Sequence, residues 1–416
     1  MSNTIPPPVP GDPSTQAGPP PVPGTPAGPP PVPGAAGLAE SLETPAPAPA
    51  AAAALTSQCP SCGAQTTYKP GTTRLRCSNC GAERDIAAST AAITELSFDD
   101  WVAKNPGAAI ATVGAQTVKC SGCGAVSETT DLAGTCQFCK GALIATDHPA
   151  GLVAPEAVVP FGLAQTDAQK AFGTWIGSRW FAPGALKKVG SAAGLKGTYL
   201  PHWTYDAHTE TDYRGERGEH YYVTRTREVS DGKGGMRTET YQEQETRWYP
   251  AAGHVNRDFD DVLVVGTHLL PEKKLHKMGP WTLADAVPFQ PEYLTGYSAV
   301  RYDVDPTTGA DTAKQEMRST VEGDCRHDIG GDEQRVSNMD VSYSQTMFKL
   351  VLLPLWIASY LYAGKTWQVL VNANTGEVIG DRPYSKGKIA LAIIGVLVVI
   401  AAIVGIVLAA KGGGSS

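Results

Sequence analysis

Eight of the nine cysteines in this 416-residue chain occur in two sets that have the spacing of metal ligands. Each set consists of two Cys-x-x-Cys pairs, separated by fourteen residues in the first set and by twelve in the second. The sets are Cys59, Cys62, Cys77 and Cys80, and then Cys120, Cys123, Cys136 and Cys139. A Cys-x-x-Cys turn lets two thiolates reach one metal ion, and a second turn completes a tetrahedral shell of four sulfurs. The spacing therefore predicts two zinc ribbons.

The chemistry of the ligands indicates which metal is expected. Soft thiolates in groups of four favour zinc, with an iron–sulfur centre as the alternative. Four disulfides are a third possibility, but a cytoplasmic domain would not keep them. Because a closed shell of four sulfurs leaves no open coordination position, we expect two structural Zn²⁺ ions and no catalytic metal. The ninth cysteine, Cys325, stands apart and is predicted to be a packing thiol.

Sequence signatures of catalysis are missing. Neither H-E-x-x-H nor G-x-S-x-G occurs in the chain. Residues 364–366 resemble the end of a phosphate-binding loop, but they follow an apolar stretch instead of a glycine-rich turn. We therefore expect a protein that is not an enzyme.

A long apolar run near the C-terminus predicts a membrane anchor. Residues 389–410 form 22 consecutive positions without a charge. At about 1.5 Å per residue, a helix of this length spans about 33 Å, which is enough to cross a bilayer. Arg382, Lys386 and Lys388 precede the run and only Lys411 follows it, a bias that places the N-terminal side in the cytoplasm. We expect a tail-anchored, single-pass protein of the plasma (inner) membrane.

The other end of the chain has a different composition. Seventeen of the 33 prolines lie in residues 1–50, and the hexapeptide Pro-Pro-Pro-Val-Pro-Gly occurs three times. Such a segment favours extended polyproline II and has too little apolar bulk to pack a core. We predict a disordered arm that serves as a spacer, or as a ligand for an aromatic groove of the SH3 or WW kind.

Residues 148–385 show the patterns of a β-rich α+β domain. The β-prone runs 220–229 and 236–248 flank a glycine-rich turn and predict a long polar hairpin. The apolar stretch 350–363 is too short to span a bilayer and is assigned to buried strands. A short repeat, Leu-Pro-x-Trp at 200–203 and 353–356, suggests two related strand pairs.

Two helices are predicted within this domain. Thr166 and Gln169 have the spacing of a capping box, and an apolar stripe follows at residues 168, 172, 175 and 176. The second helix is expected to begin after Asp305 and Pro306 and to run towards Gly330.

The fold class expected from these patterns is α+β, with two small four-cysteine ribbons, one β-rich domain and one C-terminal transmembrane helix. The predicted segments are a disordered Pro/Ala-rich arm (1–56), the first zinc ribbon (57–88), a linker (89–114), the second zinc ribbon (115–147), the β-rich α+β domain (148–385), the transmembrane helix with its flanks (386–411) and a tail (412–416).

The charge balance bears on the kind of partner. A net charge of −7 and a pI near 5.7 exclude a chain that coats nucleic acid by bulk charge. Binding driven by phosphate contacts needs a dense basic face, whereas the first ribbon has a surplus of only two cations and the second has none. Protein partners are therefore favoured, and nucleic acid is the alternative.

The paired ribbons combine with four further motifs ahead of the terminal helix. These motifs are Tyr199-Leu-Pro-His-Trp203, Phe259-Asp-Asp-Val-Leu263, Leu352-Leu-Pro-Leu-Trp356 and Gly364-Lys-Thr-Trp-Gln-Val-Leu-Val-Asn372. The pattern resembles a group of bacterial tail-anchored double zinc-ribbon membrane proteins, often named as primosomal protein N′-like, replication restart helicase-like or TFIIB-type zinc ribbon proteins. The likeness to the helicase is confined to the cysteines, since the chain has no helicase motor motif.

The resemblance implies a function and a set of partners. Similar membrane zinc-ribbon proteins act beside an SPFH-type protein in recruiting phage shock protein A to stressed membranes. We therefore expect a non-enzymatic, membrane-anchored scaffold on the cytoplasmic face that recruits protein partners of the SPFH and phage-shock types. The alternative is a membrane-tethered nucleic-acid-binding protein that uses the same ribbons.

Overall fold

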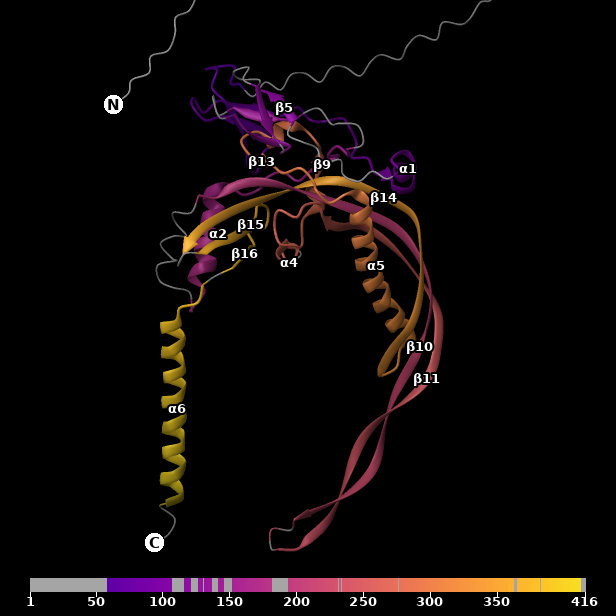
Figure 1. Cartoon of the computed structure of the whole chain (residues 1–416). Helices are drawn as coiled ribbons and strands as arrows, with labels where there is room; N and C mark the ends of the chain where they lie inside the picture. Colours follow the sequence, from indigo (N-terminus) through magenta and orange to yellow (C-terminus); the bar gives the residue numbers. More distant parts are fainter. Residues whose placement is uncertain are drawn as a thin grey trace, which may run out of the picture. The chain divides into compact units, whose positions relative to one another are not determined.

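Figure 1 shows the computed structural model, which describes residues 58–106, 116–120, 126–129, 131–136, 141–145, 152–181, 194–230, 232, 234–275, 277–362, 365–381 and 383–412. These residues belong to one compact unit, Ala54–Ser416. The predicted Pro/Ala-rich arm lies outside the described residues, so its disorder stays a prediction.

Strands dominate the described part of the chain, as predicted. The strands are β1 (Thr66–Lys69), β2 (Arg74–Cys77), β3 (Glu83–Asp85), β4 (Leu96–Ser97), β5 (Gln116–Lys119), β6 (Val126–Thr129), β7 (Ala133–Thr135), β8 (Ala142–Ile144), β9 (Ala157–Val158), β10 (Lys196–Ser230), β11 (Met236–Val265), β12 (Val287–Pro288), β13 (Ser298–Ala299), β14 (Glu333–Tyr362), β15 (Lys365–Asn372) and β16 (Val378–Gly380). The helices are α1 (Phe98–Lys104), α2 (Gln165–Gly177), α4 (Glu272–Leu275), α5 (Pro306–Ile329) and α6 (Lys386–Gly412), with 3-10 turns at η1 (Leu283–Asp285) and η2 (Pro291–Leu294).

Three long antiparallel strands form the centre of the large sheet. β10 pairs with β11 from His202 to Ser230 and with β14 from Lys196 to Gly218. Beyond Gly218, β10 and β11 continue as the long two-stranded hairpin seen in Figure 1. The predicted polar hairpin is therefore confirmed, and it is the outer end of two much longer strands. Residues 198–205 of β10 are buried, whereas exposed side chains prevail towards the hairpin tip.

The two Leu-Pro-x-Trp motifs lie opposite each other in this sheet. Leu200 of β10 pairs with Leu353 of β14, and the tryptophans of both motifs, Trp203 and Trp356, are buried. The apolar stretch at 350–362 is therefore the inner half of β14 and not a second membrane span, as predicted. The strand after it, β15, forms the expected hairpin with β16, and Gly376 in the turn has a positive φ of 76°.

Two bulges interrupt the ladder near one position of β10. β11 carries an extra residue next to Asp261, opposite Asp206, and β14 carries one next to Gln345, opposite Ala207. Asp261 and Gln345 have φ values of 56° and 53°, a left-handed conformation that costs about 1–2 kcal/mol for a residue with a Cβ. Bulges bend a strand and redirect its side chains. Here they bring carboxylates from different strands towards one point.

Helix α5 covers this sheet and confirms the second predicted helix. The Asp305 side chain caps its first turn by accepting hydrogen bonds from Thr307 N–H and Thr308 N–H, both at 2.9 Å. Residues at intervals of three or four along the helix are buried against the strands. Cys325 is one of them and packs beside Tyr213, which agrees with its predicted role as a packing thiol.

Helix α2 exists where it was expected, but its predicted capping box is wrong. The helix begins at Gln165, so Thr166 lies inside the first turn, and the N-cap residue Ala164 offers no side-chain hydrogen bond. Packing explains the helix instead, because Ala168, Phe172 and Ile176 are buried along one face.

Helix α6 is long and apolar enough to cross a membrane. Its window Gly387–Ile406 has a mean hydropathy of 3.2, and none of that window is buried inside the protein. Exposed apolar residues on every face are not stable in water but are expected of a helix surrounded by lipid. One candidate membrane span is therefore present in the described chain, and its orientation stays a prediction.

Candidate metal centre

The four cysteines of the first set converge on one point. The sulfurs of Cys59, Cys62, Cys77 and Cys80 all lie within 4.8 Å of one another. Cys59 Sγ is 3.6 Å from Cys80 Sγ, and Cys62 Sγ is 3.6 Å from Cys77 Sγ. Cys59 and Cys77 are buried, whereas the other two are exposed. Each close pair joins one cysteine from each turn.

These separations fit a metal shell and do not fit disulfides. With Zn–S bonds of about 2.3 Å, the sulfurs of a regular tetrahedron are about 3.8 Å apart. The two cross-turn distances of 3.6 Å are close to that value, whereas a disulfide needs about 2.05 Å. The four-cysteine group could therefore hold one metal ion.

The same backbone hydrogen bonds shape both turns. Gly63 N–H donates to Cys59 O (2.8 Å), and Cys59 N–H donates to Ala64 O (2.7 Å). The second turn makes the same two bonds: Gly81 N–H donates to Cys77 O (3.1 Å), and Cys77 N–H donates to Ala82 O (2.8 Å). Gly63 and Gly81 have φ values of 70° and 75°, a conformation that glycine adopts without strain. The cysteine spacing and the glycines therefore act together to aim the sulfurs inward.

Backbone N–H groups favour the ligand form of three of these thiols. N–H groups of Ser61 and Ala64 lower the pKa of Cys59 and Cys62, respectively. The N–H of Cys80 does the same for Cys77. For the Cys80 thiol, a backbone hydrogen bond from Ala82 lowers the pKa, but the neighbouring thiols outweigh it and raise the pKa to about 12. Zinc binding displaces the proton that Cys80 retains, because the thiolate is the form that binds the metal.

The second cysteine set is described only in part. Cys120 and Cys136 are buried and pack with Val118 and Leu143. Cys136 N–H donates to Gly141 O (2.7 Å), a bond between residues five apart that both turns of the first set also make. Cys123 and Cys139 lie outside the described residues. The second zinc ion therefore stays a prediction.

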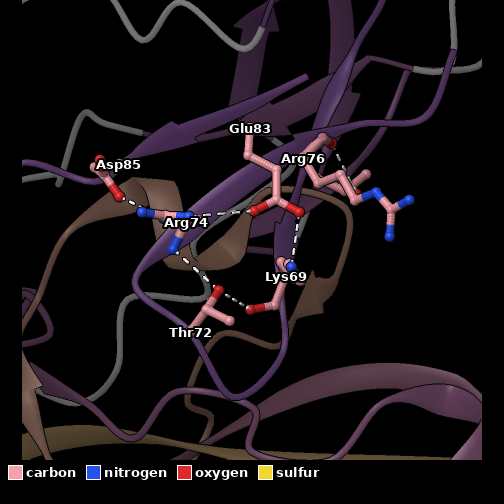
Figure 2. A network of polar contacts seen from close by, with 7 residues as sticks. Lys69, Thr72, Arg74, Arg76, Glu83 and Asp85 are labelled. Atoms are coloured by element: carbon pink, nitrogen blue, oxygen red, sulfur yellow. Dashed lines mark hydrogen bonds and ion pairs between the residues drawn. The ribbon is translucent and has the colours of Figure 1, made fainter. Parts of the chain in front are cut away.

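Ion pairs hold the outer strands of the first ribbon together, as Figure 2 shows. Glu83 of β3 accepts from Lys69 of β1 (2.7 Å), which lowers the pKa of its carboxyl group. Arg74 of β2 pairs with Asp85 (2.7 Å). Figure 2 shows that the Arg76 guanidinium points away from these carboxylates, and it makes no hydrogen bond or ion pair with the described residues. Exposed pairs of this kind contribute about 0–1 kcal/mol each.

The first ribbon is joined to the large sheet by backbone bonds and a shared core. Tyr68 N–H donates to Thr295 O (2.9 Å), and Gly71 N–H donates to Phe161 O (2.8 Å). The Tyr68 ring packs edge-on against Tyr293, with 5.2 Å between the ring centroids. Tyr68, Leu75 and Ile86 of the ribbon belong to one hydrophobic cluster with residues of the sheet. The sequence predicted separate segments here and did not indicate that they share a core.

The sequence also did not indicate a second cluster, built from charged residues at the bulges. Ligand atoms of Glu95, Asp206 and Asp261 lie within 4.8 Å of one another. Lys349 Nζ lies 2.6 Å from Glu95 Oε1 and 2.6 Å from Asp261 Oδ1, so an ammonium group already balances the carboxylates. No local pattern could have revealed the cluster, because Glu95 and Lys349 are 254 residues apart.

The pKa values in this cluster shift because charge is held away from water. Burial, together with the neighbouring Glu95, raises the pKa of Asp206 to about 7. Burial lowers the pKa of Lys349, but hydrogen bonds from its ammonium to Asp261 and Glu95 outweigh that effect and the pKa is raised. We interpret this cluster as a structural ion-pair group at the bend of the sheet.

Comparison with known proteins finds one curated relative. The chain is 26% identical, over 334 residues, to an uncharacterized protein, YdjG, of Bacillus subtilis (strain 168), and the match covers 80% of this chain and 91% of that protein. No protein-family model and no solved structure matches the chain. The resemblance to tail-anchored double zinc-ribbon proteins therefore stays an expectation from the sequence motifs.

Proposed function

We propose that this protein is a non-enzymatic adaptor that holds protein partners at a membrane. The observation that carries the proposal is the shared core of the first ribbon and the large sheet. Because the ribbon is fused to the same unit that ends in α6, a partner bound at the ribbon is held at the bilayer. A ribbon on a free linker would also tether a partner, but it would not fix the partner's position against the sheet.

The metal has a structural role in this proposal. Cys59, Cys62, Cys77 and Cys80 would hold one zinc ion, and the second cysteine set would hold another. With four thiolates in place, the first shell has no position for a substrate or a water molecule. The ion fixes the two turns, and β1 and β2 then present the ribbon surface. The function that follows is binding, without a chemical step.

The side of the membrane and the partner class are part of the proposal. The basic residues ahead of the apolar run of α6 favour a cytoplasmic location for everything N-terminal to that run. The resemblance of the sequence motifs to tail-anchored double zinc-ribbon proteins implies partners of the SPFH and phage-shock types, in a response to membrane stress. We expect such partners to be retained only when the first metal site is intact.

The test is purification of the full chain from detergent-solubilised membranes, followed by zinc analysis and identification of bound proteins. The wild type should contain two zinc ions and retain SPFH- or phage-shock-type partners. Cys77→Ser should lose one zinc ion and most of the partners. Cys325→Ala, which removes a buried thiol outside both cysteine sets, should keep both. Equal partner retention by Cys77→Ser, or no partner of these classes with the wild type, would refute the proposal.

A further inference from the structure

A cleft of about 730 Å³ opens where the first ribbon meets the large sheet. One wall comes from β1 and β2 of the ribbon, and the other comes from the start of β10 and the segment 296–298. Thr135 of β7 and the start of α2 complete it. The cleft therefore exists only because the ribbon is fixed to the sheet.

Among the residues that the structure describes, three cations and no anion line this cleft. They are Lys69 on β1, Arg76 on β2 and Lys196 on β10, and none of the lining residues that the structure describes is Asp or Glu. Lys69 is held in place by its ion pair with Glu83. The exposed side chains of Arg76 and Lys196 make no hydrogen bond or ion pair with the described residues, so their charges are available to a ligand.

The walls of the cleft are formed before any ligand binds. Tyr297 stacks on Phe161 with 4.2 Å between the ring centroids. A Cβ on Gly197 would overlap the Tyr297 ring, and Gly296 has a φ of 90° beside Thr67. A preformed surface loses little conformational entropy on binding. The cations project from this fixed frame.

The charge and exposure of the cleft indicate an anionic ligand that is a polypeptide. The chain as a whole carries a net charge of −7, so three cations at one place form a local positive patch on an acidic protein. Such a patch attracts and orients the acidic part of a partner. A small-molecule site buries 70–90% of its ligand, whereas Arg76 and Lys196 are exposed. A nucleic-acid strand would need a longer basic track than three cations. An acidic peptide matches both the number of cations and their exposure.

We propose that this cleft binds an acidic segment of a protein partner, with carboxylates of the segment paired to Arg76 and Lys196 and with Lys69 beside them. The inference rests on the proposed adaptor function and names the chemistry of the partner's contact. It also explains why the ribbon must be fused to the sheet, since each contributes part of the binding surface.

The test uses the full chain in detergent micelles and a fluorescein-labelled decapeptide made of Asp and Glu, with fluorescence anisotropy as the readout. The wild type should bind the peptide, with an affinity that falls as salt rises. Arg76→Gln combined with Lys196→Gln should weaken binding at least fivefold. Lys104→Gln combined with Arg237→Gln removes the same charge from exposed residues outside the cleft and should leave binding within twofold.

Additional measurements keep the result interpretable. Zinc content is measured in each variant because Arg76 adjoins Cys77, and Lys196→Gln alone, which lies outside the ribbon, should also weaken binding. Equal binding by the cleft and control variants would overturn the inference. Tighter, variant-sensitive binding of a labelled ten-nucleotide thymidine strand would also overturn it, in favour of nucleic acid. Displacement of the peptide by micromolar pyrophosphate would overturn the inference as well, and would indicate that the cleft binds a small anion.

The inference and the proposed function can fail separately. If the cleft binds the peptide but the purified wild type retains no partner protein, the proposed adaptor function fails and the cleft remains a binding site for acidic segments. Partner retention that is unaffected by Arg76→Gln with Lys196→Gln would keep the adaptor function and remove the cleft from it.

Discussion

Replacing Lys349 by methionine should destabilise the large sheet at its bend. Methionine keeps the unbranched stem as far as Cε but removes the ammonium group that Glu95 and Asp261 share. The two carboxylates, together with Asp206, would then repel one another where water only partly reaches them. The fold should retain its topology, because the strands on both sides of the bulges pair over many residues.

The magnitude follows from the exposure of the partners. Removing one member of a buried ion pair costs about 3–5 kcal/mol. The Lys349 side chain is 11% exposed, but those of Glu95 and Asp261 are 29% and 31% exposed, so water stabilises part of the uncompensated charge. We therefore expect Lys349→Met to lower the free energy of unfolding by about 2–3 kcal/mol.

Urea unfolding of the full chain in detergent micelles at pH 8, followed by tryptophan fluorescence, measures this loss. At pH 8 the carboxyl group of Asp206, with its pKa of about 7, is largely ionised in the wild type, where Lys349 lowers that pKa, so the loss of Lys349 is felt most at this pH. Lys104→Met, at an exposed position on α1, is the matched control and should change stability by less than about 0.5 kcal/mol.

A second substitution decides whether charge is the cause. Adding Asp261→Asn to Lys349→Met removes one of the repelling carboxylates, and asparagine tolerates the left-handed backbone at this position. The double variant should regain a substantial part of the lost stability. If it is no more stable than Lys349→Met alone, lost packing and not uncompensated charge explains the effect, and the reasoning is refuted.

Three further predictions concern Asp206, the N-terminal cap of α5 and the apolar helix α6. Folded Asp206 keeps its proton up to about pH 7, whereas an unfolded Asp releases it near pH 4, so this group stabilises the fold below pH 4 and its contribution is lost as pH rises towards 7. Asp206→Asn should therefore flatten the fall in urea midpoint between pH 5 and 8, and an unchanged profile would contradict this. Asp305→Ala should cost about 1–2 kcal/mol in urea unfolding through loss of the α5 cap, whereas Asp311→Ala, exposed within the helix, should cost far less. Deletion of residues 386–416 should move the protein from the membrane to the carbonate-soluble fraction, and continued membrane retention would show that α6 is not the anchor.

Several features could be predicted because their causes are local. The Cys-x-x-Cys turns, their glycines and the capped start of α5 each depend on residues within a few positions of one another. Composition alone sufficed for α6, since a helix that is apolar on all faces must be surrounded by apolar groups and this one is long enough to span a bilayer. The capping box at Thr166 failed for the opposite reason: a local pattern was present, but burial of Phe172 and Ile176 set where α2 lies.

The sequence by itself determined which residues can bind metal and which segment can enter a bilayer, because thiolate chemistry and hydrophobicity belong to the residues themselves. Only the tertiary structure decided that the first ribbon shares a core with the large sheet and that Arg76 and Lys196, 120 positions apart, line one cleft. It also decided that Lys349 meets Glu95 at the bulges. These juxtapositions arise from strand pairing across long stretches of chain, and spacing along a sequence does not encode which distant segments will be neighbours.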